Sequence, residues 1–281
     1  MNKRKIVLLA VALCMAAILG MGSTLAYLTD TDNATNVFTV GNVQIEQYEK
    51  DRNGNDFVDG QKLLPIVDDK KDSNGYHTGG NYIDKIVTVK NTGTEPAFLR
   101  TYIAFPANLD NGPTTYDPMK NILHWNGASA NDSFGLANQN MDNDWYWSKD
   151  FTTDYPAAGS NAWNGYTTTV KGVLYNVYIA THKTAVPKDA TTAPNLYGVY
   201  LDKGVDFLKK NDNGQDVYVD QNGNEFIYPA SVEVLVMSLG VQSEGWLDTN
   251  GNGSAADEAF DEAFGKVGEY CPFGGTIGQV Y

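Results

Sequence analysis

The chain has little of the chemistry on which most enzymes depend. Its 281 residues contain two cysteines and three histidines, and His77, His124 and His182 lie far apart. No H-E-x-x-H sequence sets two of them at the spacing of a zinc peptidase. No G-x-S-x-G sequence marks a serine nucleophile, and no histidine lies near Cys271 in the sequence. We therefore expect no enzymatic activity, and we expect the histidines to be ordinary loop or edge residues.

Positive charge is scarce as well. Twenty Lys and Arg residues stand against 34 Asp and Glu residues, which gives a formal net charge of −14. A chain this acidic repels phosphate backbones and anionic lipid surfaces, which argues against a nucleic-acid-binding function. The same charge is compatible with divalent cations.

The N-terminus has the layout of a secretory signal peptide. A basic head at Lys3–Lys5 precedes an uncharged apolar run, Ile6–Gly22. The alternative is an uncleaved anchor, but this run is at the short end for crossing a bilayer. Thr24 and Ala26 are small residues at the positions that a signal peptidase reads, so cleavage is predicted between Ala26 and Tyr27. The membrane is then contacted only through residues 1–26, before cleavage.

Cleavage would change both the charge and the cysteine count. Three basic residues and no acidic ones leave with the signal, so the net charge falls from −14 to −17. Cys14 leaves too, and Cys271 then has no intramolecular partner for a disulfide. A chain of this length can instead be stabilised by a large hydrophobic core.

The remaining chain is typical of an all-β protein. It is rich in aromatic and β-branched residues, which glycine-, asparagine- and aspartate-rich turns interrupt. Alternation places Val43, Ile45 and Gln47 on one strand face. The segments 83–91 and 97–106 also alternate, and the Asn-Thr-Gly sequence between them predicts a hairpin.

Other segments are predicted from the same patterns. The strand at 230–242 is apolar on both faces, which is typical of the centre of a covered sheet. Gly172 is expected to form a bulge in the strand segment 167–182. Residues 106–166 have little regular pattern and are expected to form a loop-rich insertion. One helix is predicted, from Ser254 as N-cap to a stop at Gly265, with Phe260 and Phe264 one turn apart.

The start of the mature chain resembles a known family of exported proteins. Residues 26–46, "AYLTDTDNATNVFTVGNVQIE", together with "VTVKNTGTEPAFLRTYI" from Val87, are similar to the TasA/camelysin-like family. The matching positions, in order, are Tyr27, Asp30, Thr31, Asp32, Asn36, Phe38 and Gly41. The segment that begins at Val241 also looks like the C-terminal part of related proteins, whereas residues 106–225 match nothing that we can place. The resemblance implies export with a signal removed by a SipW-type signal peptidase.

The resemblance also implies a fold and a role. The expected fold is an all-β, jelly-roll-like β-sandwich with long loop insertions and a short C-terminal helix, over residues 43–281. The expected role is structural, in the extracellular matrix or at the cell surface, with partners that are further copies or related matrix proteins. In the best-known members, the N-terminal mature segment adds a strand to the next subunit. Part of the camelysin branch has been classed as metallopeptidases, which the histidine spacing does not favour.

Three interpretations of the N-terminal segment stay open. Residues 27–42 form a polar tether and a donor strand for a neighbour, or the strand after them belongs to its own domain, or the N-terminus has no regular structure. An exposed strand edge is a pairing template in the first case. The residues expected in an assembly strand are Val37, Phe38, Val40, Val43 and Ile45.

Two acidic segments are weak candidates for calcium loops. Alternate Asp and Asn residues around a glycine bend can supply the several oxygens that calcium needs. One segment offers Asp248, Asn250, Asn252 and Asp257; the other offers Asp51, Asn53, Asn55 and Asp59. A third, at Asp220, is weaker. The alternative for all three is an ordinary Asx-rich turn, since Asn-Gly pairs occur wherever a hairpin needs positive φ.

A cluster of aromatic residues suggests a second function class. The middle of the chain holds Trp125, Trp145, Tyr146, Trp147, Trp163 and Tyr166. Such rings, flanked by amides, can stack on sugars, so a monomeric glycan-binding surface protein is the alternative function. Large aromatics also anchor long loops to a core, and burial of these rings would favour that explanation.

Overall fold

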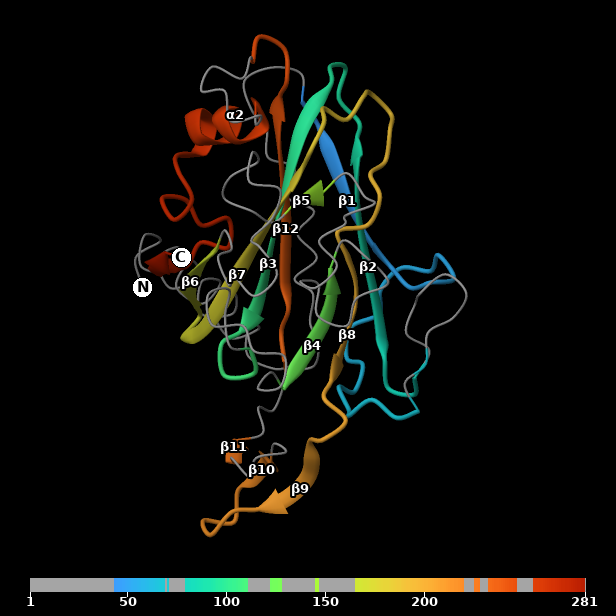
Figure 1. Ribbon diagram of the computed structural model, residues 1–281, viewed down its shortest axis with the longest axis vertical. Coiled ribbons are helices and arrows are strands. Elements are labelled where there is room, and N and C mark those ends of the chain that lie inside the picture. The colour runs from blue at the N-terminus through green and yellow to red at the C-terminus, as the bar shows by residue number, and fades with distance from the viewer. Residues whose placement is uncertain are drawn as a thin grey trace, which may run out of the picture.

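The computed structural model is a β-sandwich with a single helix in its described part (Figure 1). The residues described are 43–68, 70, 79–110, 122–127, 145–146, 165–219, 225–227, 232–246 and 255–280. Two antiparallel sheets form the body, and a short helix near the C-terminus packs on one of them. The prediction of an all-β sandwich with a short C-terminal helix is therefore confirmed.

The smaller of the two main sheets, here called sheet I, has four antiparallel strands. Its order is β1-β2-β8-β4. The strands are β1 (Ile45–Lys50), β2 (Ile83–Asn91), β8 (Leu196–Leu201) and β4 (Leu123–Gly127).

The larger sheet, sheet II, has the order β12-β3-β7-β6-β13, and β5 pairs with β7 as well. Its strands are β12 (Leu235–Gln242), β3 (Ala97–Pro106), β7 (Val173–His182), β6 (Gly165–Val170), β13 (Thr276–Val280) and β5 (Trp145–Tyr146). A third, small sheet of β9 (Asp206–Lys210), β10 (Asp216–Val219) and β11 (Glu225–Ile227) projects from one end of the sandwich (Figure 1).

The hairpin predicted between 83–91 and 97–106 is wrong. β2 pairs with β1 and β8 in sheet I, whereas β3 pairs with β12 and β7 in sheet II, so the connection crosses from one sheet to the other. The buried Asn91 forms the corner. Its side-chain amide donates to the carbonyls of Glu95 (2.8 Å) and Val186 (2.9 Å), and its Oδ1 accepts from the Gly93 N–H at 2.9 Å.

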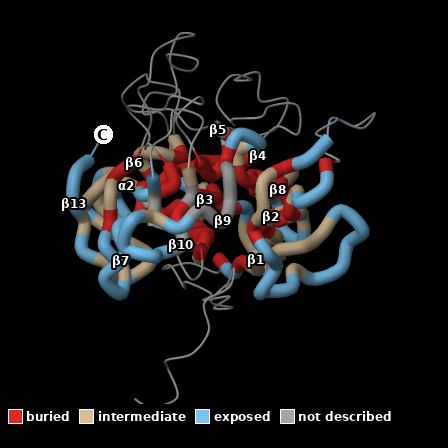
Figure 2. Tube along the Cα trace, turned by 90° about the horizontal axis from the view of Figure 1, so that it is seen from below, coloured by how far each residue is buried: buried red, intermediate tan, exposed pale blue. Residues whose placement is uncertain are grey.

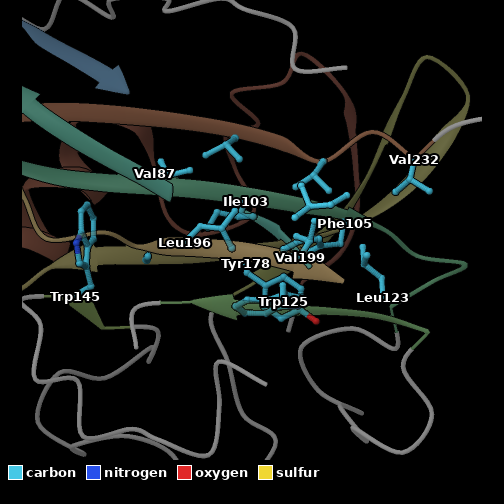
Figure 3. Packing of buried hydrophobic residues seen from close by; sticks show 14 of the residues in the cluster. Val87, Ile103, Phe105, Leu123, Trp125, Trp145, Tyr178, Leu196, Val199 and Val232 are labelled. Carbon is cyan, nitrogen blue, oxygen red and sulfur yellow. The ribbon is translucent and has the colours of Figure 1, made fainter. Parts of the chain in front are cut away.

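The main core lies between the two sheets. Alternate residues of β2 and β3 point into it, including Val87, Ile103 and Phe105, and buried residues gather in the middle of the molecule (Figure 2). Figure 3 shows Phe105, Trp125 and Tyr178 in one cluster. Phe105 stacks on Trp125 with ring centroids 5.0 Å apart, and Tyr178 meets Trp125 edge-on at 4.9 Å. Offset and edge-to-face arrangements of this kind stabilise a core beyond simple burial.

A second core covers the other face of sheet II. Helix α2 (Ala255–Phe264) and the chain after it pack against alternate residues of β3, β7 and β12, so all ten residues of β3 are buried. The helix ends as predicted at Gly265, whose φ of 81° suits glycine and whose N–H donates to the Asp261 carbonyl at 2.9 Å. Ser254, the predicted N-cap, lies outside the described residues.

Three further expectations need correction. β12 is covered on both faces, as its sequence predicted, but it ends the strand order of sheet II instead of lying at the centre. Residues 106–166, expected to be loops, contain β4 and β5, and Trp125 of β4 lies in the core. Gly172 (φ 84°) follows Lys171 (φ 49°) in the two-residue turn between β6 and β7 and is not a bulge.

Candidate functional site

The first strand enters the sandwich over a glycine. Val43 and Ile45 are 2% and 3% exposed and lie in the main core. A Cβ on Gly240 of β12 would lie 2.9 Å from a Val43 methyl carbon and 3.1 Å from one of Ile45. Glycine at this position therefore gives the start of the first strand room to pack against sheet II.

β1 is part of its own domain. It pairs antiparallel with β2 from Ile45 opposite Asn91 to Lys50 opposite Ile86. The Gln44 carbonyl just before it accepts from two backbone N–H groups of the β2–β3 corner, at 2.8 and 2.9 Å. The other residues predicted for the assembly strand, Val37, Phe38 and Val40, lie outside the described residues. So do Ala26 and Tyr27, at the predicted cleavage position.

A chain of hydrogen bonds joins β1 to the opposite sheet. Ser238 of β12 donates to Gln47 Oε1 at 2.7 Å, and Gln47 Nε2 donates to the Val236 carbonyl at 3.4 Å. The Ser238 hydroxyl in turn lies 2.8 Å from that of Thr101, which accepts from Asn195 Nδ2 at 2.8 Å. Alternation placed Gln47 on the same strand face as Val43 and Ile45, which is the face toward the core, and this network satisfies the polar atoms of Gln47 there.

The same network continues to an ion pair on the inner face of sheet I. Gln47 Nε2 also donates to Glu49 Oε1 at 2.8 Å, and Lys85 Nζ of β2 donates to Glu49 Oε2. The side chains of Lys85 and Glu49 are 1% and 8% exposed. The ring of Phe57 covers the ammonium, with its centroid 4.3 Å from Nζ. Sequence reasoning missed this pair, although the alternation of Ile83, Lys85 and Val87 was a signal for it.

Asp51, the first calcium candidate, stabilises its own turn. Its carboxylate accepts from the N–H groups of Asn53 (2.8 Å) and Asn55 (2.9 Å) and from Asn55 Nδ2 at 2.8 Å. These bonds, that of the Asn55 side chain first, hold the pKa of Asp51 below its usual range. The arrangement is the Asx-rich turn considered as the alternative, with Gly54 at φ 83°. Asp59 is exposed.

A second turn repeats this geometry. Asn211 Oδ1 accepts from the N–H groups of Asn213 and Gln215, each at 3.0 Å, and Gly214 takes a φ of 73°. The lysine before each turn donates to its glycine carbonyl, Lys50 at 3.2 Å and Lys210 at 3.4 Å. The sequence prediction did not include the Asn211 turn. Its sequence, "NDNGQ", has the same pattern as "DRNGN" at Asp51, and that pattern was the signal for it. The Asp220 segment lies almost wholly outside the described residues.

Asp257, from the other calcium candidate, anchors helix α2 to the sheet. The side chain of Arg100 in β3 donates to Asp257 Oδ1 at 2.5 Å and to the Thr181 hydroxyl at 3.0 Å. The guanidinium also lies over the Phe260 ring, 4.4 Å from its centroid. Asp248, Asn250 and Asn252 lie outside the described residues. Nowhere in the described part of the chain do three His, Cys, Asp or Glu side chains gather as a group that could hold a metal ion.

The described aromatic rings of the middle segment are core residues. Trp125, Trp145 and Tyr166 are each 0% exposed, and Trp145 Nε1 donates to the Ala193 carbonyl at 2.8 Å. These three rings therefore offer no surface for stacking on a sugar. Trp147, Trp163 and the side chain of Tyr146 lie outside the described residues.

The two described histidines belong to different sheets. His124 of β4 is buried, stacks on Tyr200 and lies 2.9 Å from the Asp202 carboxylate. Burial would raise the pKa of Asp202, but the hydrogen bonds from His124 and the Gly204 N–H outweigh it, so this pKa is lowered. His182 of β7 is buried, and its Nδ1 donates to the Thr184 carbonyl at 2.6 Å. His77 lies outside the described residues.

A mainly apolar groove of about 550 Å³ lies at one end of sheet II, beside the β6–β7 turn. Val173 and Leu174 line it and are 44% and 49% exposed. Tyr175 and Glu233 are among its polar residues. Burial, and next the charge of Glu233, raise the pKa of Tyr175 to about 12, so this phenol stays neutral at ordinary pH.

Comparisons with family models, with curated proteins and with solved structures gave no match.

Cys271, the free cysteine among the described residues, is half-buried, with its Sγ 3.4 Å from the Thr168 hydroxyl. In the described ranges we find no helix with the length and apolar character needed to span a bilayer. Any proposal of function therefore depends on the sequence patterns and on the geometry of β1 and the sheet edges.

Proposed function

We propose that this chain is an exported structural protein of the cell surface or extracellular matrix, which assembles when its N-terminal segment adds a strand to a neighbouring copy. The signal-like N-terminus and the resemblance of residues 26–46 support export. The position of β1 supports the assembly step. This strand lies at the end of sheet I and begins three residues after the polar, β-capable segment 27–42.

The part of the N-terminus that is free to pair is narrower than the sequence indicated. Val43 and Ile45 are buried over Gly240, and Gln47 is hydrogen-bonded to β12. Moving them to another subunit would expose apolar area, at a cost of about 1.5–3 kcal/mol for each large side chain. The exchanged strand therefore consists of Val37, Phe38 and Val40, while Val43 and Ile45 stay in their own domain.

β13 is the sheet edge that accepts this strand. Of the strands that end the two main sheets, it is the most exposed: four of its five residues are exposed and the fifth is half-buried. Val280 on it is 47% exposed. Exposed edges with unpaired N–H and C=O groups pair readily with another strand.

Deletion of Tyr27–Val40 from the mature protein tests this function. Electron microscopy and sedimentation of the intact secreted protein are expected to show fibres that lengthen with concentration, and the deletion is expected to abolish them. Undiminished fibres from the shortened protein would rule out strand addition. A full-length protein that stays monomeric at high concentration would contradict the assembly itself.

A matched pair of substitutions tests the accepting edge. Val280→Lys places a charge on the proposed edge and is expected to slow fibre growth about tenfold, which corresponds to about 1.4 kcal/mol of added activation free energy. Val58→Lys changes the same residue type at a position that is 68% exposed and lies in the connection between β1 and β2. It is expected to leave fibre growth unchanged. Equal effects of the two substitutions would exclude β13 as the accepting edge.

A further inference from the structure

A lysine lies on the core face of sheet I. Along β2, buried and half-buried residues alternate, and Lys85 takes a buried position between Ile83 and Val87. Its side chain is 1% exposed, and its ammonium contacts the Glu49 carboxylate. Charged residues are rarely buried so completely, because the loss of hydration costs several kcal/mol for each ion.

The register brings these two side chains together on adjacent strands. Glu49 of β1 lies opposite Val87 of β2, and Lys85 is two residues from Val87 on the same face. Diagonal neighbours of this kind are within reach of long side chains. The Phe57 N–H donates to the Glu49 carbonyl at 2.9 Å, which holds the Phe57 ring over the ammonium and separates the pair from solvent.

We propose that Lys85 and Glu49 condense to form an intramolecular isopeptide bond that joins β1 to β2. The ammonium first gives a proton to the carboxylate, which leaves a neutral amine and a neutral acid. The amine nitrogen then attacks Cδ of Glu49, the bond from Cδ to one oxygen breaks, and that oxygen leaves as water with two protons. One proton stays on the amide nitrogen, and no oxidant, reductant or other reactant is consumed.

The surroundings favour each stage of this reaction. Weak solvation at this buried site destabilises separated charges and so favours the uncharged amide product. Fixed contact between the two groups replaces a collision, and effective molarities in well-oriented intramolecular reactions reach about 10⁵–10⁸ M. Gln47 Nε2 donates to Glu49 Oε1, the oxygen that stays bound, and stabilises the negative charge that develops there during attack.

The bond would act in place of a disulfide, for which Cys271 would have no intramolecular partner after the predicted cleavage. The strand that carries the N-terminus would be joined covalently to sheet I near its far end, so that a pull on the preceding segment could separate β1 from β2 no further than Glu49. This role does not depend on fibre formation, because the bond lies within one chain.

Peptide mapping of the intact secreted protein tests the proposal. After denaturation and trypsin digestion, mass spectrometry is expected to show a branched peptide in which the peptide ending at Lys50 is joined to residues 72–90, lighter by one water than their sum. Trypsin does not cleave after a modified Lys85. Intact mass alone would not decide, because Asp59-Gly60 can lose one water by forming a cyclic imide. Three linear peptides, which end at Lys50, Lys85 and Lys90, would overturn the proposal, since the pair would then be an ordinary ion pair.

Two substitutions in β2 provide the control. Lys85→Arg keeps the positive charge but removes the nucleophilic amine, so the branched peptide is expected to disappear. Lys90→Arg changes a half-buried lysine on the opposite face of the same strand and is expected to keep it. A branched peptide that persists in Lys85→Arg would also overturn the proposal. Since the unsubstituted protein alone shows whether the bond exists, a failure of Lys85→Arg to fold would not affect that result.

Discussion

The contact between Arg100 and Asp257 allows a sharp test of how helix α2 is held. The Arg100 side chain is 2% exposed and makes its 2.5 Å bond to a carboxylate that is 16% exposed. Asp257→Ala removes the carboxylate and leaves the guanidinium buried, with its bond to Thr181 and its place over Phe260. Removal of one partner from a buried pair costs about 3–5 kcal/mol. The partial exposure of Asp257 places the expected loss near the lower end of that range.

The loss is measured by urea and thermal unfolding, followed by circular dichroism and tryptophan fluorescence. For a domain of this size, about 1 kcal/mol lowers the melting temperature by about 2–4 °C, so a drop of roughly 6–12 °C is expected. Glu262→Ala, at an exposed position of the same helix, should change stability by less than about 0.5 kcal/mol. The double substitution Arg100→Met with Asp257→Leu should recover most of the loss. A loss below about 1 kcal/mol for Asp257→Ala would refute the anchoring role.

Three further outcomes follow from the packing and the charges. Gly240→Ala should destabilise the protein by about 1–3 kcal/mol, because the added methyl meets Val43, and hydrogen exchange should then speed up in β1. Asp202 has a lowered pKa, so its stabilising contribution is present above its unfolded-state pKa and is lost as the pH falls through the folded-state pKa. Asp202→Asn should therefore reduce the loss of stability at acid pH, measured as the free energy of unfolding against pH. An unchanged pH dependence would show that the bond to His124 contributes nothing. Burial raises the pKa of Asp261, so its contribution is lost as pH rises; Asp261→Asn should therefore increase stability at neutral pH, and a decrease would show that the charge is favourable there.

Local patterns predicted those parts of the fold that depend on a single segment. Alternation placed Val43, Ile45 and Gln47 on one face of a strand, and the spacing of Phe260 and Phe264 with Gly265 predicted α2. In each case the residues that decide the structure lie within one strand or one helix. Side-chain periodicity is then sufficient evidence.

The errors arose where distant residues decide the structure. The turn after Asn91 has hairpin chemistry, but at the corner the Asn91 side chain is bonded to the carbonyl of Val186, which lies 95 residues further along the chain. β4 was missed because Asn- and Gly-rich segments flank it, and only its pairing with β8 makes it a strand. Arg100 gave no sign of its partner, since Asp257 lies 157 residues further along. Periodicity contains no information about contacts of this kind.

The burial of β3 on both faces has a consequence for how the chain reaches its folded state. Its neighbour β12 is far away in the sequence: Thr101 and Ser238, which face each other across the ladder, are 137 residues apart. Long-range pairing of this kind is slow to form, and an apolar strand that waits for its partner is prone to aggregate. Nascent chains that lack β12 would therefore leave one edge of β3 unpaired and be prone to aggregate until β12 has been synthesised.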